Sequence, residues 1–275
     1  MIFKNLSIFT HRLGQTKIGV AYGPKNLGYL IQLLTNNSIN VKTLKLPNET
    51  IEEDMNMIYE SCRSFGSQKR VHLGGDHSLS IATISNMLNF KPNLKLIWVD
   101  AHADINTYES SITKNYHGMP LSYLTHLNRK SEFNFTKHKL DFKNILYIGL
   151  RDIDPFEKSI INKHNIKVLD IDTIRQNRKE TITCIQDFMG TNPIYLSFDV
   201  DVLDPSIMEC TGTPVNNGLF QKETKELMKP ILQNINLCGV EIVEFNPIDK
   251  DYEIIKDNMH TIYDIFRPIF DKNVV

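Results

Sequence analysis

The stretch "KLIWVDAHADIN", residues 95–106, joins a run of apolar residues directly to Asp100, His102 and Asp104. A run of Leu, Ile, Trp and Val is typical of a buried β-strand. In an extended segment alternate side chains point to one face, so the three ionisable groups converge on one side. Two carboxylates and an imidazole placed in this way repel and desolvate one another unless a cation lies between them. The stretch therefore predicts a cation at the end of a buried strand.

The composition is that of an ordinary globular chain with a sizeable core. With 275 residues, 41% hydrophobic and 23% charged, the chain is long enough for one α/β domain, which we expect to span residues 1–275. Its 31 basic and 32 acidic residues give a net charge of −1, which argues against a broad nucleic-acid or membrane-surface footprint. No segment approaches the ~20 apolar residues of a membrane-spanning helix. Because the N-terminus shows no secretory pattern, we expect a cytoplasmic protein.

Short apolar runs alternate with longer amphipathic stretches along the whole chain. We expect strands near 17–21, 41–46, 70–74, 94–99, 144–149, 166–170, 194–198 and 237–243. Helices are expected over 25–36, 50–66, 78–89, 155–164, 178–190, 221–235 and 251–266. This alternation predicts a three-layer α/β/α sandwich around a mostly parallel, roughly eight-stranded, doubly wound sheet. In such sheets the ligand site lies outside the carboxyl ends of the strands.

Four of the expected strands are followed directly by acidic or imidazole groups. The motifs GGDHS, DAHAD, DVDVLDP and EIVE follow or end the strands at 70–74, 94–99, 194–198 and 237–243. One motif alone has a simpler explanation: Asp76 and Ser78 could cap a helix, and His102 could be a hydrogen-bonded core histidine. Four such motifs at one edge of a sheet indicate a common cause.

Metal binding is the common cause that fits these groups. The candidate ligands are two imidazoles and four carboxylates, namely His77, Asp100, His102, Asp104, Asp199 and Asp201. They are too many for one tetrahedral zinc ion, but they suit two ions about 3.5–4 Å apart with bridging carboxylates. Oxygen-rich ligation favours two Mn(II) ions, with Co(II) or Ni(II) as possible substitutes. A water between two such ions would lose a proton near neutral pH and become a nucleophile.

The motifs GGDHS, DAHADIN, SFDVDVLDP, CTGTP and VEFNP together resemble those of the ureohydrolases, the arginase and agmatinase family. The resemblance runs in order through nearly the whole chain, from GVAYGP onward, and is weakest over about 28–68. It implies a binuclear manganese enzyme that hydrolyses a guanidino group to urea and an amine. It also implies that His77, Asp100, Asp104 and Asp199 hold one ion and that Asp100, His102, Asp199 and Asp201 hold the other.

The loop DINTYESSITKNYHGMP resembles that of arginases more than that of agmatinases. The resemblance then implies that Asn106, Thr113 and Asn115 contact the α-carboxylate of L-arginine, directly or through water. Asp154 would take the α-ammonium, with Glu157 as a more distant helper. One departure is visible, since arginases commonly have Ser-Gly where this chain has Thr113-Lys114, and Lys114 adds bulk and charge.

The resemblance also implies catalytic roles. Glu244 would pair with the guanidinium and place its carbon over a metal-bridging hydroxide, and Asp201 would carry that proton to the leaving amine. His117 would be the proton shuttle to bulk water, although as a residue alone it could equally cap a turn. Thr213 would support the guanidinium or Glu244. The expected products are L-ornithine and urea.

Several alternatives remain open from the sequence. The same chemistry could act on agmatine, guanidinobutyrate or a similar compound, in which case Asn115 and Asp154 would not matter. A deacetylase related to this fold would have one zinc ion and fewer acids. A non-catalytic arginine-binding or scaffold protein would keep only the fold. The resemblance further implies a homo-oligomer, a trimer or hexamer, with a small-molecule substrate and no nucleic-acid or membrane partner.

The four cysteines, Cys62, Cys184, Cys210 and Cys238, lie far apart with no CxxC pair. This spacing argues against a zinc ribbon or redox motif and predicts reduced thiols.

Overall fold

A computed structural model describes residues 3–128 and 132–271 of the chain. In these residues eight strands form one sheet in the order β2-β1-β3-β8-β7-β4-β5-β6. The strands are β1 (Asn5–Phe9), β2 (Asn40–Leu44), β3 (Arg70–Leu73), β4 (Lys95–Val99), β5 (Ile145–Ile148), β6 (Lys167–Leu169), β7 (Ile194–Asp199) and β8 (Leu237–Val243). Every pairing between neighbouring strands is parallel, which confirms the predicted sheet.

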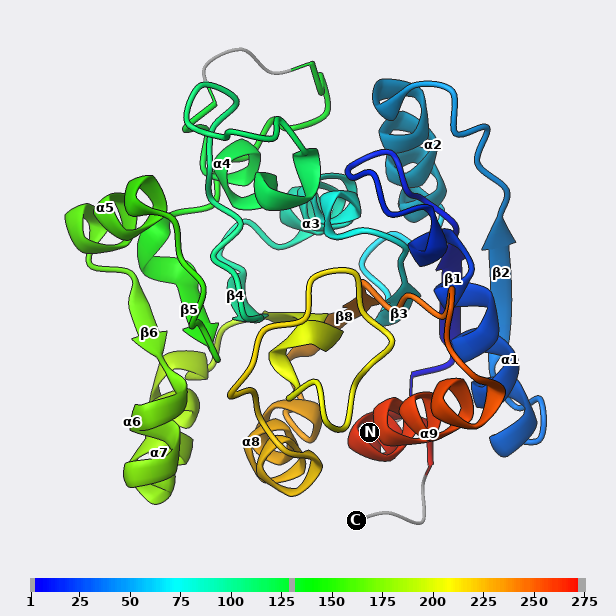
Figure 1. The fold of residues 1–275 in the computed structure, drawn as a ribbon. Coiled ribbons are helices and arrows are strands. Elements are labelled where there is room, and N and C mark those ends of the chain that lie inside the picture. The colour runs from blue at the N-terminus through cyan, green and yellow to red at the C-terminus, as the bar shows by residue number, and fades with distance from the viewer. Residues whose placement is uncertain (1–2, 129–131, 272–275) are drawn as a thin grey trace.

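Helices cover both faces of this sheet (Figure 1). One face carries α2 (Ile51–Arg63), α3 (Ser80–Phe90), α4 (Pro120–Leu124) and α5 (Pro155–His164). The other carries α1 (Gly23–Leu34), α6 (Ile171–Gln176), α7 (Arg178–Met189), α8 (Gln221–Leu232) and α9 (Tyr252–Phe270). The three layers match the predicted sandwich. Within the described ranges, none of the helices combines the length and apolarity needed to cross a membrane.

The expected strand at 17–21 is wrong. Residues Ile18–Ala21 form a short 3-10 helix (η1) that leads into α1, and the strand lies earlier, at β1. Gly19 packs so closely on the segment after β8 that a Cβ there would lie 1.8 Å from Oδ1 of Asn246. This tertiary contact, which the local pattern does not reveal, overrides the strand propensity of the apolar run.

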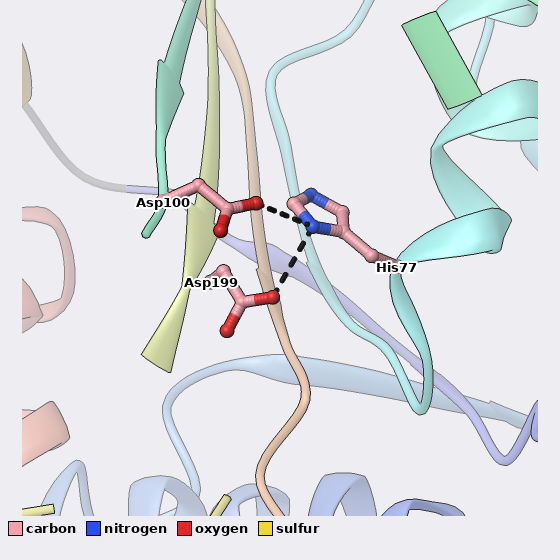
Figure 2. Close-up of side chains that lie close together, drawn as sticks. All are labelled: His77, Asp100 and Asp199. Atoms are coloured by element: carbon pink, nitrogen blue, oxygen red, sulfur yellow. Dashed lines mark ion pairs between the residues drawn. The ribbon is translucent and has the colours of Figure 1, made fainter. Parts of the chain in front are cut away.

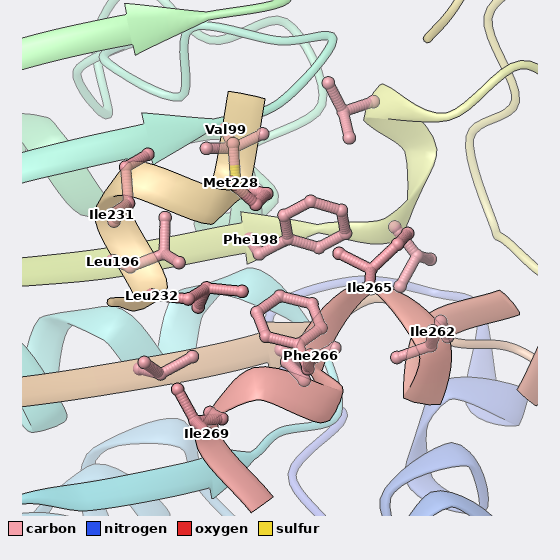
Figure 3. Close-up of a cluster of buried hydrophobic side chains, with 14 of the residues drawn as sticks. Val99, Leu196, Phe198, Met228, Ile231, Leu232, Ile262, Ile265, Phe266 and Ile269 are labelled. Carbon is pink, nitrogen blue, oxygen red and sulfur yellow. The ribbon is translucent and has the colours of Figure 1, made fainter. Parts of the chain in front are cut away.

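Alternate side chains of the central strands pack into two separate hydrophobic layers, one on each face of the sheet. On β4, Ile97 and Val99 are buried on the side of α8 and α9, whereas Leu96 and Trp98 are buried on the side of α3. Figure 3 shows the first layer, in which Phe198 meets Phe266 edge-on with ring centroids 5.0 Å apart. Strands buried on both faces explain why the sequence shows apolar runs and not simple alternation.

The strand order brings the four motif-bearing strands together. In the centre of the sheet β3, β8, β7 and β4 are consecutive neighbours, although they lie far apart in sequence. Because parallel strands end at the same edge, GGDHS, Glu244, DVD and DAHAD all emerge side by side. The fold therefore concentrates the chemically active residues at one edge.

A tight contact inside the sheet makes the fold sensitive to Gly239. A Cβ at this position on β8 would lie 2.3 Å from the buried ring of Tyr195 on β7. Gly239→Ala should therefore lower the free energy of unfolding by about 1–3 kcal/mol, measured by denaturant titration. Gly118→Ala is the matched control, because a Cβ there meets nothing within 4 Å among the described residues. Equal stabilities of the two variants would contradict the argument.

Candidate metal centre and substrate cavity

His77 lies at the centre of the first candidate metal group. It opens the 3-10 helix η2 (His77–Leu79) after β3, and its ring stacks on Trp98 at 4.0 Å between centroids. Its Nδ1 lies 3.1 Å from a carboxylate oxygen of Asp100, 3.1 Å from one of Asp104 and 3.3 Å from one of Asp199. Figure 2 shows the ring pointing at the Asp100 and Asp199 carboxylates. Even so, Nδ1 makes no hydrogen bond to any described residue.

The other ring nitrogen of His77, Nε2, is held by a hydrogen bond on the side away from the carboxylates. Its Nε2 lies 2.8 Å from the hydroxyl of Ser197, which itself donates to Glu241 at 2.7 Å. Because the hydroxyl proton is directed at the carboxylate, Nε2 is the donor in the first contact. The lone pair of a neutral His77 is then on Nδ1, aimed at the three carboxylates. An imidazole held in this tautomer by a hydroxyl or carboxylate partner is the usual arrangement of a metal-ligating histidine.

A second group lies beside the first and shares Asp100 with it. Nδ1 of His102 lies 3.1 Å from Asp201 and 3.5 Å from Asp100. Potential ligand atoms of His77, Asp100 and Asp199 all lie within 4.8 Å of one another, as do those of Asp100, His102 and Asp201. The described residues therefore offer two adjacent ion positions with a common carboxylate, which fits a binuclear site.

The proton affinities of these groups show how strongly the cluster attracts positive charge. Burial lowers the pKa of His77, but the Asp100, Asp104 and Asp199 carboxylates reverse this and hold it well above its usual range. Burial and the neighbouring Asp201 and Asp100 raise the pKa of Asp199 well above its usual range. Burial and Asp100 raise the pKa of Asp104 to about 6. Asp100 differs, because the His102 and His77 imidazoles outweigh the effect of burial and hold its pKa below its usual range. A cluster in which His77, Asp104 and Asp199 all bind protons more tightly than usual attracts positive charge, and two divalent ions would supply it.

Neighbouring side chains fix the orientation of the candidate ligands. Trp98 Nε1 donates to Asp100 at 2.9 Å, and the Thr213 hydroxyl donates to Asp201 at 2.8 Å. Asp104 adopts a left-handed backbone conformation, with φ of 49°. Such strain in a non-glycine residue is typical of functional sites. The candidate ligands are therefore held in place by the fold.

A cavity of about 350 Å³ opens over the cluster. Among the described residues its wall combines three candidate metal ligands, the expected proton shuttle and most of the expected substrate-binding groups, namely His102, Asp104, Asp199, His117, Asn106, Thr113, Asn115, Asp154, Glu157 and Thr213. Its volume is in the range of small-molecule sites. The residues expected to bind metal and those expected to bind an amino acid thus share one cavity.

The far wall of the cavity is an ordered polar network. Asn106 donates to Asp154 at 2.8 Å, and Glu157 accepts the backbone N–H groups of Ile105 and Asp154, each at 3.0 Å. Burial raises the pKa of Glu157 to about 8, despite the N–H donors that lower it. Glu157 completes the capping box of helix α5 with Asp154, and so helps to hold this wall in place.

Lys114 is turned away from the cavity. Its Nζ donates to the backbone carbonyl of Tyr108 at 2.5 Å and lies 5.0 Å from the centre of the Tyr108 ring. It is not among the described residues that line the cavity. The bulk and charge that distinguish Thr113-Lys114 from Ser-Gly therefore face the outside of the loop.

Glu244 and His117 meet at the opposite side of the site. The Glu244 carboxylate is buried and accepts the backbone N–H of His77 at 2.8 Å, and Nδ1 of His117 lies 3.4 Å from the same oxygen. Burial lowers the pKa of His117, but Glu244 outweighs this and raises it to about 9. His117 reaches the cavity wall, whereas Glu244 lies behind it among the described residues.

Sequence reasoning missed three residues of the site. Ser197 supports His77, Asp152 lies 3.7 Å from Nε2 of His102, and Gln15 donates to Glu244. Ser197 and Asp152 stand two residues from an expected ligand or substrate-binding residue, and this spacing could have drawn attention to them. Gln15 carried no such signal, because its partner is 229 residues away.

The chain is similar to known proteins over most of its length. The model of the arginase family matches residues 12–260 of the chain. Hepatic arginase of Aquarana catesbeiana is 38% identical over 218 residues, 76% of this chain and 67% of that protein. Arginase of Eremothecium gossypii is 36% identical over 221 residues, 77% of this chain but only 54% of that protein.

The fold of the chain is also similar to that of solved arginase structures. The structure of Entamoeba histolytica arginase in complex with L-ornithine superposes with a TM-score of 0.86 and 30% identity, covering 97% of this chain and 99% of that chain. The family model, the relatives and the fold therefore agree, and the chain belongs to the arginase family.

Proposed function

We propose that this protein hydrolyses the guanidino group of L-arginine to give L-ornithine and urea. The observation that carries the proposal is the shared cavity, in which metal-ligating groups lie opposite the Asn106–Asp154 pair. An amide next to a carboxylate suits the carboxylate and ammonium ends of an α-amino acid. The likeness to an arginase in complex with L-ornithine supports the same substrate class.

We infer that the six carboxylate and imidazole groups hold two Mn(II) ions. His77, Asp100, Asp104 and Asp199 would hold one ion, and Asp100, His102, Asp199 and Asp201 the other. Hard, oxygen-rich ligation with two imidazoles supports manganese, with Co(II) or Ni(II) as substitutes. When bound, the ions supply Lewis-acid activation of water near neutral pH.

The other side chains bind, orient and move protons. Glu244 would pair with the guanidinium and so fix its carbon above the cluster. Asp201, oriented by Thr213, would take a proton from the attacking water and pass it to the leaving amine. His117, which reaches the cavity wall beside Glu244, would exchange protons with bulk water. Asn106, Thr113, Asn115, Asp154 and Glu157 would recognise the amino-acid end.

We propose that residues 1–275 act as one domain, in the cytoplasm, as a homo-oligomer of three or six chains.

The first test is urea release from L-arginine and from agmatine, after incubation with Mn(II) and after chelation. Urea should form from L-arginine only when metal is present, and agmatine should be a poor substrate because it lacks the α-carboxylate. The opposite preference would keep the metal site but reject the roles of Asn115 and Asp154. Two bound metals without urea from either compound would overturn the proposal.

His117→Asn should lower kcat for urea release by at least about tenfold, because the variant cannot exchange the proton. The content of bound metal should stay unchanged, since His117 is not a candidate ligand. His126→Asn is the matched control: this imidazole contacts the carbonyl of Thr136 outside the cavity, at a left-handed position that asparagine tolerates. Wild-type turnover in His117→Asn would remove the residue from the mechanism.

A further inference from the structure

Both oxygens of the Glu244 carboxylate are held by hydrogen bonds. One accepts the backbone N–H of His77 at 2.8 Å, and the other accepts the side-chain amide of Gln15 at 2.5 Å. The Glu244 backbone is left-handed, with φ of 66°, and its N–H donates to the carbonyl of Gly75 at 2.8 Å. A carboxylate held at both oxygens on a strained backbone has a defined orientation.

Gln15 comes from a segment before α1 that is itself firmly anchored. The backbone N–H of Gly14 donates to Asp76 at 2.8 Å, and the N–H of Asp76 donates to the carbonyl of His11 at 3.2 Å. The buried ring of His11 lies 2.8 Å from Asp54 and 3.0 Å from the Ser78 hydroxyl. These contacts tie the segment to the loop that carries His77.

Gly14 allows this close approach. A Cβ at Gly14 would lie 2.3 Å from Oδ1 of Asp76, so the segment could not lie where it does with a larger residue. The carbonyl of Gly14 also accepts the backbone N–H of His117 at 3.1 Å. One short segment therefore contacts the loops of His77 and His117 and delivers the Gln15 amide to Glu244.

The orientation of the Gln15 amide is settled by its partner. A carboxylate oxygen at 2.5 Å can only accept, so the nitrogen and not the oxygen of the amide faces Glu244. The amide oxygen is then buried without a partner in the described part of the chain. An apolar side chain would fill the same space without an unpaired acceptor. A role in packing alone therefore does not explain a glutamine here.

We propose that Gln15 is a positioning residue for guanidinium recognition, acting by orienting the carboxylate of Glu244. The inference rests on the proposed function, in which Glu244 pairs with the guanidinium. Without the Gln15 donor, the Glu244 carboxylate keeps, among the described residues, the His77 N–H and the nearby His117 ring, and it can turn away from the substrate.

The test compares Gln15→Leu and Gln15→Glu with the wild-type enzyme loaded with Mn(II). Leucine removes the donor, and glutamate keeps the shape of glutamine but replaces the donor by a second carboxylate. Both variants should lower kcat/KM for L-arginine by about 10- to 100-fold, the range for a hydrogen bond to a charged group. The inhibition constant of L-ornithine, which lacks the guanidinium, should change by less than about threefold.

Gln221→Leu is the matched control, because Gln221 donates to a carboxylate, that of Asp264, on the surface of α8 at 3.4 Å. Its kcat/KM should equal that of the wild type. Wild-type kcat/KM in Gln15→Leu and Gln15→Glu would overturn the role of Gln15 and leave the proposed function intact. An equal loss of L-ornithine binding would also overturn it, since Gln15 would then only maintain the fold. A wild-type protein without urea release from L-arginine would overturn the proposed function and this inference together.

Discussion

Electrostatic repulsion among buried carboxylates is the constraint on which the rest of this structure depends. Asp100, Asp104, Asp199 and Asp201 are all buried at one edge of the sheet, where an unpaired negative charge is strongly unfavourable. The two nearby imidazoles cannot neutralise four carboxylates at neutral pH. Protons relieve part of this repulsion, since the pKa values of Asp104 and Asp199 are raised, whereas cations among the oxygens would relieve it with every carboxylate ionised.

The surroundings of the cluster hold each group in one orientation. Trp98 fixes Asp100, Thr213 fixes Asp201, and Ser197 fixes the tautomer of His77. Behind Ser197, the carboxylate of Glu241 also accepts hydrogen bonds from Thr83 at 2.6 Å and Tyr195 at 3.0 Å. Such supporting contacts keep the candidate metal ligands in place before a metal ion or a substrate binds, so that binding requires little rearrangement of the side chains.

The sequence predicted the sheet and the clustering of the candidate ligands, because both depend on local patterns and on a general rule. Apolar runs mark the central strands, and parallel strands present their carboxyl ends at one edge. The same reasoning failed at 17–21, where a tertiary contact of Gly19 decides the backbone. It could not find Gln15, whose partner lies 229 residues away. Contacts of this kind depend on the folded chain and leave no periodic trace.

The central position of β3, β8, β7 and β4 has a further consequence for how the protein loses activity. The outermost strands, β2 and β6, are the parts of the sheet most prone to local opening, and neither carries a candidate metal ligand in the described residues. Fraying at the rim therefore leaves the candidate ligands in place, because they follow strands that are paired on both sides. Ions that bind only to the folded cluster would stabilise the fold by mass action, so the free energy of unfolding would depend on the free metal concentration.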